Sequence, residues 1–228
     1  MKNQEKIKQM LLMQQNLNDE TNGQGWENGV TKDGKIITWR RCIYMECAEL
    51  IDSFAWKHWK NISAAPNLQN IKIELADIWH FIMSLFLENH HGDMDFDGLA
   101  HEIAASTLFS EFCKEAYDIN AYNQYEIINE IEIIINETSK NAVNFEILLK
   151  NYFALCLKCG VNLCVLFELY MGKNVLNKFR QNHGYKDGNY KKIWGKKEDN
   201  EVLSELLAAG ILNSQELYNE LEKIYKGL

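Results

Sequence analysis

Apolar residues recur every three or four positions along most of this sequence, and no stretch alternates apolar and polar residues convincingly. The first pattern indicates amphipathic helices, whereas alternation would indicate half-buried strands. A single proline, Pro66, and 13 glycines also leave few positions for the many turns that a sheet requires. The sequence therefore predicts an all-α fold, a helical bundle that forms one domain over residues 1–228.

The periodic segments predict helices with short loops between them. The helices are expected at about residues 4–19, 38–60, 67–89, 99–117, 121–139, 144–159, 162–180, 198–207 and 214–225. Thr38 is a plausible N-cap for the second of them. Residues 22–34 hold four glycines, and residues 181–195 are rich in glycine, asparagine and tyrosine, so both stretches are expected to be loops.

Composition and charge narrow the class of protein. Apolar residues make up 46% and charged residues 25% of the chain, as in ordinary globular proteins. No apolar run approaches the roughly 20 residues of a membrane span, and the polar start MKNQEKIKQM lacks the apolar core of a secretion signal. The formal net charge of −8 argues against general nucleic-acid binding. We therefore expect a cytoplasmic protein whose partners include neither a membrane nor a nucleic acid.

The six cysteines lie mostly in apolar helical stretches. Cys156 and Cys159 form a CxxC pair, which could indicate zinc binding or redox chemistry, but no second CxxC or histidine pair follows at ligand spacing. Buried, reduced thiols are therefore the favoured interpretation.

Two similar acidic motifs, ECAEL at 46–50 and ELADI at 74–78, lie in the most apolar part of the sequence. Residues three apart share one face of a helix, so Glu46 points with Glu49, and Glu74 points with Asp77. The short break around Pro66 makes the two helices antiparallel neighbours whose acidic faces can meet. Four carboxylates in apolar surroundings would repel one another unless a cation lay between them. Mg²⁺, a hard cation that binds oxygen ligands, is the simplest candidate.

Other interpretations of these acids remain open. A single ExxE motif is most often a solvated helix face, although two copies on adjoining helices argue against that. Di-iron carboxylate proteins use Glu-x-x-His motifs in helical bundles, and Asp77 with His80, or Glu88 with His91, has the same spacing. Both pairs fall in one helical stretch, which spoils the four-helix arrangement, so di-iron binding is kept as an alternative.

The segment 173–197 is basic, with eight lysine or arginine residues, one acidic residue and a net charge of +7. A solvated face or a nucleic-acid patch would explain basic residues with aromatic residues between them. Gly184, Gly188 and Gly195 instead suggest a tightly shaped loop that wraps a small polyphosphate. With a magnesium site nearby, the segment indicates a nucleoside di- or triphosphate as the ligand. The basic residues are Lys173, Lys178, Arg180, Lys186, Lys191, Lys192, Lys196 and Lys197.

Several motifs together resemble a known family. They are MQQNLND at 13–19, the two acidic motifs, WKHWK at 56–60 and KNVLNKFRQNHGYKDGNYKKIW at 173–194. In their order along the chain, with WKHWK between the two acidic motifs, they resemble the all-α nucleoside triphosphate pyrophosphatases of the MazG-type superfamily, and most closely the dimeric dUTPases. The resemblance covers essentially the whole chain, which implies one all-α dUTPase domain over residues 1–228.

The resemblance implies Mg²⁺-dependent hydrolysis of dUTP, and of dUDP, to dUMP by a homodimer. Glu46, Glu49, Glu74 and Asp77 would bind the metal, and Glu49 would also orient and deprotonate the attacking water. The implied contacts to uracil and deoxyribose are Gln15, Asn18, Trp59 and His80. The implied contacts to the phosphates and the closing loop are Lys173, Asn177, Arg180, Tyr185 and Lys192.

The choice of base rests on the resemblance alone. A pyrophosphatase for dCTP or for nucleoside triphosphates in general is the nearest alternative. A helical metal-binding or nucleic-acid-interaction module without catalysis belongs to a different class. The basic segment favours catalysis only if it can fold over the acids. Apolar stretches such as 127–135, beyond what one bundle needs, lend the homodimer some support.

Overall fold

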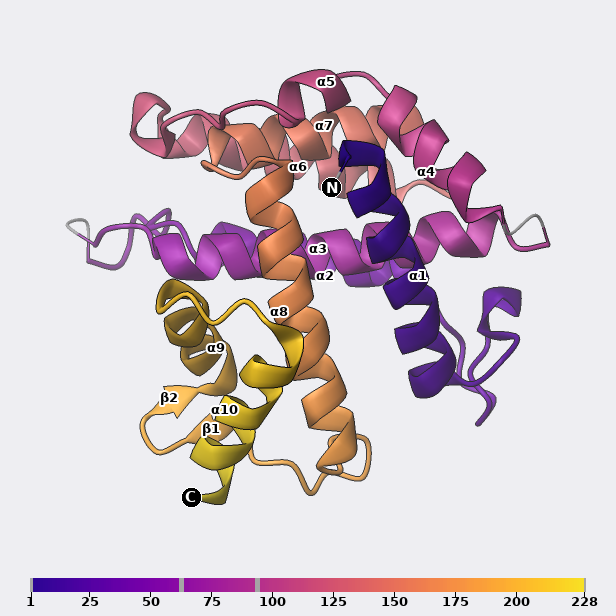
Figure 1. The fold of residues 1–228 in the computed structure, drawn as a ribbon. Coiled ribbons are helices and arrows are strands. Elements are labelled where there is room, and N and C mark those ends of the chain that lie inside the picture. Colours follow the sequence, from indigo (N-terminus) through magenta and orange to yellow (C-terminus); the bar gives the residue numbers. More distant parts are fainter. Residues whose placement is uncertain (1, 62–63, 93–94, 228) are drawn as a thin grey trace.

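The computed structural model describes residues 2–61, 64–92 and 95–227. Within these residues the regular structure is helical apart from one two-stranded hairpin and an isolated bridge between Val30 and Ile36, so the all-α prediction is confirmed (Figure 1). The α-helices are α1 (Asn3–Asn22), α2 (Trp39–Asp52), α3 (Leu68–Asn89), α4 (Phe96–Ala105), α5 (Phe109–Phe112), α6 (Gln124–Ser139), α7 (Phe145–Lys158), α8 (Leu163–Asn182), α9 (Asp199–Ala208) and α10 (Ser214–Lys226). Two short 3-10 helices are η1 (Trp26–Asn28) and η2 (Ile119–Ala121).

The hairpin pairs β1 (Ile193–Trp194) with β2 (Lys197–Glu198) in antiparallel register, Ile193 opposite Glu198. The sequence pattern does not predict it, because two residues per strand are too few to show alternation. Gly195 has φ of +67° at the turn, a conformation that glycine adopts without strain. The hairpin brings the end of the basic segment back towards α8.

Two predicted helices are shorter than expected. The helix predicted at 38–60 ends at Asp52, because Trp56 and Lys57 fold back onto the Asp52 carboxylate. Trp56 Nε1 donates to Asp52 Oδ1 at 3.0 Å, and Lys57 Nζ donates to Asp52 Oδ2 at 2.7 Å. The WKHWK motif therefore lies in a loop. The helix predicted at 99–117 is divided into α4 and α5 at Leu108, whose φ of 69° is outside the helical region.

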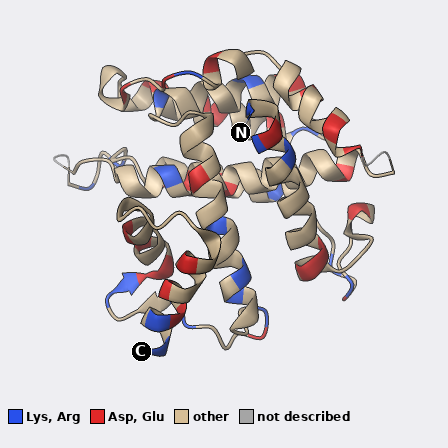
Figure 2. Ribbon diagram, in the orientation of Figure 1, with Lys and Arg blue, Asp and Glu red and all other residues tan. Residues whose placement is uncertain are grey.

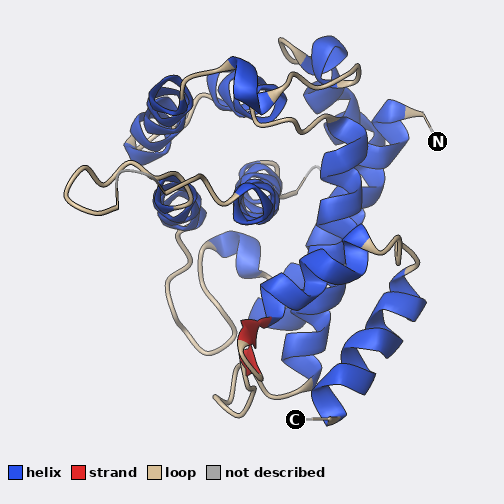
Figure 3. Cartoon of the chain, turned by 90° about the vertical axis from the view of Figure 1, so that its left-hand side faces the viewer, coloured by secondary structure: helices blue, strands red, loops and turns tan. Residues whose placement is uncertain are grey.

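The centre of the fold is α3, which is apolar on nearly all sides and correspondingly buried. Figures 1 and 3 show α2 and α3 side by side, with α6 and α7 in the next layer and α1 and α8 crossing the pair. Across the layers, the Trp79 ring stacks on Tyr152 with centroids 5.3 Å apart, and the Tyr152 hydroxyl donates to the Leu75 carbonyl at 2.8 Å. The acidic motifs are thus held on two neighbouring helices at the middle of the molecule.

A second apolar cluster fixes the basic segment. Its buried residues come from the C-terminal half of α8, the hairpin, α9 and α10, together with one residue of α3. Phe179 lies at the centre, with ring contacts to Trp194, Tyr218 and Tyr225. The members are Ile73, Val175, Leu176, Phe179, Trp194, Val202, Leu203, Leu217 and Leu221. The hairpin and α9 are therefore packed against α8.

Helix α8 approaches α9 closely at Gly172. A Cβ atom there would lie 2.9 Å from Leu207 Cδ1, so a larger residue would require the Leu207 side chain to move. This contact lies next to Lys173 in the chain and packs α8 against the second half of α9.

The burial of the cysteines agrees in part with the prediction of buried thiols. Cys47, Cys156 and Cys159 are buried free thiols, as predicted, and burial raises the pKa of Cys159 to about 12. Cys164 is exposed, which the prediction missed.

Among the described residues no single helix has the length and apolar character to cross a membrane, although α7 and α8, bent by 97°, would qualify by length and composition if taken together.

Candidate active site

Three of the four predicted acids meet between α2 and α3. Carboxylate oxygens of Glu46, Glu74 and Asp77 all lie within 4.8 Å of one another. Glu74 is 5% exposed and Glu46 is half-buried, so the cluster faces little water. Glu49, one turn beyond Glu46, is exposed and lies with Glu74 at the edge of the cluster.

Burial and crowding raise the pKa values of two of these acids. Burial and then the neighbouring charges, Asp77 first, raise the pKa of Glu46 to about 8. Burial, followed by the charge of Asp77, raises the pKa of Glu74 to about 7. Asn70 steadies Glu74, because its amide donates to Glu74 Oε1 at 3.0 Å and to Ser53 Oγ at 2.8 Å. The ionised cluster therefore needs positive charge to be stable at neutral pH.

One lysine supplies part of that charge. Lys173 of α8 is 1% exposed, and its ammonium lies 2.9 Å from Asp77 Oδ2 and 2.9 Å from Asn200 Oδ1. A single ammonium cannot balance three carboxylates. The oxygen donors, their separation and the remaining negative charge fit a hard divalent cation.

A hollow of about 320 Å³ opens beside the acids. Its volume is at the lower end of the range of sites for small organic ligands. Eight of the predicted residues line it, namely Asn18, Glu46, Asp77, His80, Lys173, Asn177, Arg180 and Tyr185. A neighbouring hollow of about 450 Å³ is lined by Glu49, Glu74 and Lys192, among others. The acid cluster thus borders both hollows.

Gln14 organises the polar end of the first hollow. Its amide nitrogen donates to Ser84 Oγ at 3.0 Å and to Asn18 Oδ1 at 3.1 Å. Its oxygen therefore accepts from His80 Nδ1 at 2.7 Å and lies 3.2 Å from the Tyr170 hydroxyl. This arrangement assigns the imidazole proton to Nδ1.

His80 consequently presents a free acceptor. Burial lowers the pKa of His80 to about 3, so the ring is neutral at physiological pH. With the proton on Nδ1, Nε2 carries a lone pair, and this buried atom has no hydrogen-bond partner among the described residues. A hydrogen-bond donor that reaches Nε2, from a ligand in the hollow or from a water molecule, would satisfy it.

An aromatic wall lines the same hollow. Trp39 stacks on Phe81 with ring centroids 6.0 Å apart, and Trp26 meets Trp39 edge-on at 5.6 Å. Trp59, the aromatic residue predicted for this role, is 61% exposed and contacts the rings of Trp56 and His58 instead. The side chains that could contact a base in this structure are therefore Trp39 and Phe81.

Gln15 also lies away from the hollow. Its amide donates to Asp19 Oδ1 at 3.1 Å and to Glu27 Oε1 at 2.7 Å, which ties η1 to α1. The sequence contains the signal that distinguishes Gln14 from Gln15, because Ile7, Leu11 and Gln14 follow the helical spacing of the buried stripe.

The basic segment lies beside the acids at two points, since Lys173 pairs with Asp77 and Lys192 lines the second hollow with Glu49 and Glu74. Lys186 donates to the Thr21 carbonyl and to Asp33 Oδ2, both at 3.1 Å, so the loop after α8 meets the loop after α1. The Tyr185 ring lies 5.7 Å from the Arg180 guanidinium carbon. Figure 2 shows the basic residues of α8 and the hairpin in the lower part of the molecule. At the second hollow, Lys192 Nζ lies 3.3 Å from Glu198 Oε2.

A family model described as dUTPase matches residues 6–185. The matched region contains the acid cluster, the Gln14 network and α8, and it stops before the hairpin and α9. The comparison with curated proteins finds no match.

Proposed function

Since this chain belongs to the dUTPase family and is a dUTP diphosphatase, we propose that it hydrolyses dUTP, and also dUDP, to dUMP with the help of Mg²⁺ bound at the acid cluster. The observation that carries this proposal is the meeting of Glu46, Glu74 and Asp77 within 4.8 Å, beside a lined hollow. The proposed catalytic domain includes the C-terminal elements, because Lys173 and Arg180 bond residues of α9.

Glu46, Glu49, Glu74 and Asp77 are the proposed metal ligands. When bound, the cation neutralises phosphate charge and makes a nearby water more acidic. Glu49, the exposed member, is the proposed base, because water reaches it from the neighbouring hollow. In the proposed reaction Glu49 takes a proton from water, the water oxygen bonds to the β-phosphorus, and the bond from that phosphorus to the α-phosphate oxygen breaks. The products are dUMP and pyrophosphate.

We infer tolerance of dUDP from the proposed point of attack. If attack occurs at the β-phosphorus, the γ-phosphate adds affinity but takes no part in the bond changes, so dUDP gives dUMP and orthophosphate. Lys173, Asn177 and Arg180 line the first hollow with Tyr185, and Lys192 lines the second. We propose that these five residues contact the phosphates, where ammonium and guanidinium groups donate charge-assisted hydrogen bonds.

The first hollow favours uracil over cytosine as the base. His80 Nε2 needs a donor, and uracil offers N3–H, as deoxyribose offers a hydroxyl, whereas N3 of cytosine is itself an acceptor. Asn18 adds an amide at the same end. Trp39 and Phe81 provide an apolar wall for the ring. We leave Gln15 and Trp59 out of the proposed site, since neither lines the hollow.

A nucleotide panel tests the proposal. Formation of monophosphate should be measured with Mg²⁺ for dUTP, dUDP, dTTP, dCTP and UTP. We expect turnover of dUTP and dUDP, and at least about tenfold lower kcat/KM for dCTP, because its N3 would face the His80 lone pair. Comparable turnover of dCTP or UTP would favour a general pyrophosphatase. If dUDP were not hydrolysed, the result would contradict attack at the β-phosphorus. If no nucleotide were hydrolysed, the result would favour a non-catalytic binding module.

We also propose that the active form is a homodimer. Apolar side chains on α6 and α7 are exposed, with Tyr125 at 53%, Ile133 at 45% and Ile147 at 41%. Burial of such residues against a second copy would be favourable. Light scattering should give twice the chain mass of 26.6 kDa at working concentration. A mass equal to one chain would contradict the dimer.

A further inference from the structure

We propose that Asp199, the first residue of α9, is a positioning residue that holds the Arg180 guanidinium in the orientation required for phosphate binding. The inference rests on the proposed function, and it adds a residue that lies beyond the stretch 6–185 matched by the dUTPase family. Asp199 is separated from Arg180 by a loop and the hairpin, so only the folded structure brings the two together.

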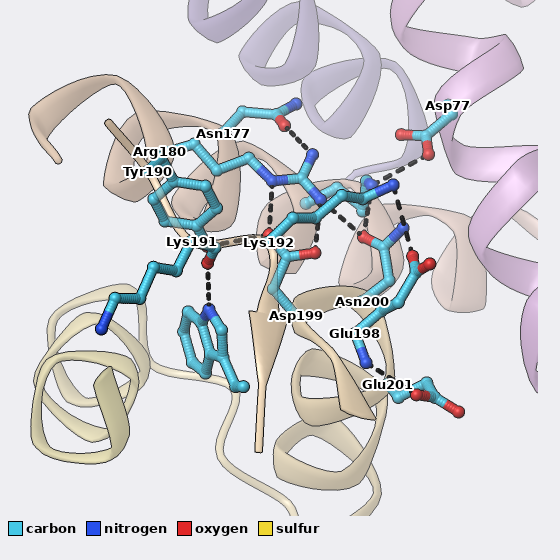
Figure 4. Close-up of polar contacts among 12 residues, drawn as sticks. Asp77, Asn177, Arg180, Tyr190, Lys191, Lys192, Glu198, Asp199, Asn200 and Glu201 are labelled. Carbon is cyan, nitrogen blue, oxygen red and sulfur yellow. Dashed lines mark hydrogen bonds and ion pairs between the residues drawn. The ribbon is translucent and has the colours of Figure 1, made fainter. Parts of the chain in front are cut away.

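Arg180 is fixed on several sides. Its Nε donates to Asp199 Oδ2 and its Nη2 to Asp199 Oδ1, both at 2.8 Å, in the bidentate geometry that orients a guanidinium most firmly. Nη1 donates to Asn177 Oδ1 at 3.2 Å, and Nη2 also donates to Asn200 Oδ1 at 3.2 Å. Figure 4 shows Arg180 between Asn177 on one side and Asp199 with Asn200 on the other.

These contacts leave a donor for a ligand. A guanidinium has five N–H groups, and the bonds to described residues occupy four of them. Within the described part of the chain, the remaining N–H of Nη1 has no partner. Because Arg180 lines the first hollow, this N–H is available to a phosphate oxygen there.

Asp199 is itself firmly held. It is 0% exposed, and Oδ2 also accepts from the Tyr190 hydroxyl at 2.8 Å. Burial opposes its charge, but the hydrogen bonds and charge of Arg180 outweigh burial and hold the pKa of Asp199 below its usual range. The carboxylate therefore stays ionised at neutral pH, as a bidentate acceptor must.

The start of α9 is fixed by local bonds. The Asp199 amide donates to the Lys192 carbonyl at 3.0 Å, and Glu198 and Glu201 form a capping box. Asn200 then accepts from Lys173 Nζ at 2.9 Å as well as from Arg180. Asp199 and Asn200, two consecutive residues, thus hold both cations that line the first hollow.

A purely structural ion pair would also be buried and bidentate, and it would join α9 to α8. Two features point beyond that role. Arg180 lines the same hollow as Asp77 and Lys173, and it keeps an unused donor there. Because Asp199 cancels the net charge of Arg180, Arg180 contributes to phosphate binding mainly through the direction in which its free N–H group points. The phosphate affinity should then depend on how Arg180 is oriented.

The test compares Asp199→Asn with the wild type and with Glu205→Gln, which changes an exposed carboxylate on the same helix. An asparagine offers one acceptor oxygen, so it cannot hold the guanidinium bidentately. We expect Asp199→Asn to raise the KM for dUTP about tenfold or more. The dissociation constant for deoxyuridine, which has no phosphate, should stay within twofold, and Glu205→Gln should match the wild type.

A double-mutant cycle separates positioning from structure. If Asp199 acts through Arg180, then Asp199→Asn should cause no further loss of kcat/KM in an Arg180→Gln background. Tyr190→Phe keeps the ion pair and the packing but removes one hydrogen bond to Asp199, so it should raise the KM for dUTP only a few-fold. This milder variant tests the inference if Asp199→Asn fails to fold. Thermal unfolding of each variant reports its folding.

Four results would overturn the inference. They are an unchanged KM for dUTP in both Asp199→Asn and Tyr190→Phe, an equal loss of deoxyuridine and dUTP binding, a further loss in the Arg180→Gln background, and inactive wild-type protein. The last result rejects the proposed function as well, whereas the first three leave it intact.

Discussion

Replacement of Glu46 by glutamine should lower kcat/KM for dUTP by at least about a thousandfold and, in EDTA, should raise the melting temperature. The loss is expected because Glu46 is one of the three carboxylates that meet at the proposed metal site. The gain in stability is expected because Glu46 without a cation is buried beside like charges. Steady-state kinetics and thermal unfolding measure the two effects.

The pH dependence sharpens this prediction. The pKa of Glu46 rises from 4.5 to about 8 in the folded protein, so the folded state binds the proton more tightly than the unfolded state. Without metal, the contribution of Glu46 to the free energy of unfolding is therefore largest below pH 4.5. It decreases as the pH rises towards about 8. Glutamine does not titrate, so the advantage of Glu46→Gln in melting temperature should grow between about pH 6 and pH 8.

Glu168→Gln is the matched control, because Glu168 is an exposed glutamate on α8 away from the acids. It should leave both activity and melting temperature unchanged. Activity of Glu46→Gln close to the wild type, or a lower melting temperature in EDTA, would contradict the assignment. The same gain in stability is not expected at Asp77, whose carboxylate is paired with Lys173 at 2.9 Å.

Lys173→Met should lower kcat/KM for dUTP by about a hundredfold. Methionine has a similar length and fills the buried site, but it removes the ammonium between Asp77 and Asn200. Without that charge the acids repel one another more strongly, so the melting temperature in EDTA should fall. The increase in melting temperature caused by Mg²⁺ should be larger than in the wild type.

Lys178→Met provides the control on the same helix. Lys178 is exposed and pairs with Glu20 at 3.4 Å, away from the first hollow. Exposed ion pairs contribute little to stability, so this variant should behave as the wild type. If Lys173→Met retained activity within twofold, or if Lys178→Met lost as much, Lys173 would have no special role.

The sequence was most informative where local spacing determines the outcome. Glu46 with Glu49, and Glu74 with Asp77, are placed by the helical repeat, and a short connection brings their helices together. Lys173, Asn177 and Arg180 share a face of α8 for the same reason, and all three line the hollow. The all-α fold follows from the same periodicity.

The sequence was less informative where tertiary contacts decide. The end of α2 at Asp52 depends on Trp56 and Lys57 folding back, which no periodicity reveals. The pair of Arg180 and Asp199 depends on the aromatic cluster that packs the hairpin against α8. Such contacts join residues far apart in the chain, so spacing alone cannot show them.

The central claim, that the acid cluster binds the catalytic cation, is tested most directly by a crystal structure with Mn²⁺ and a non-hydrolysable dUTP analogue. Mn²⁺ suits the same oxygen ligands as Mg²⁺, and its anomalous signal locates it. The account predicts a peak at about 2.1 Å from oxygens of Glu46, Glu74 and Asp77, with the β-phosphate as a further ligand. A peak elsewhere in the molecule, or bound nucleotide with no metal at these carboxylates, would contradict it.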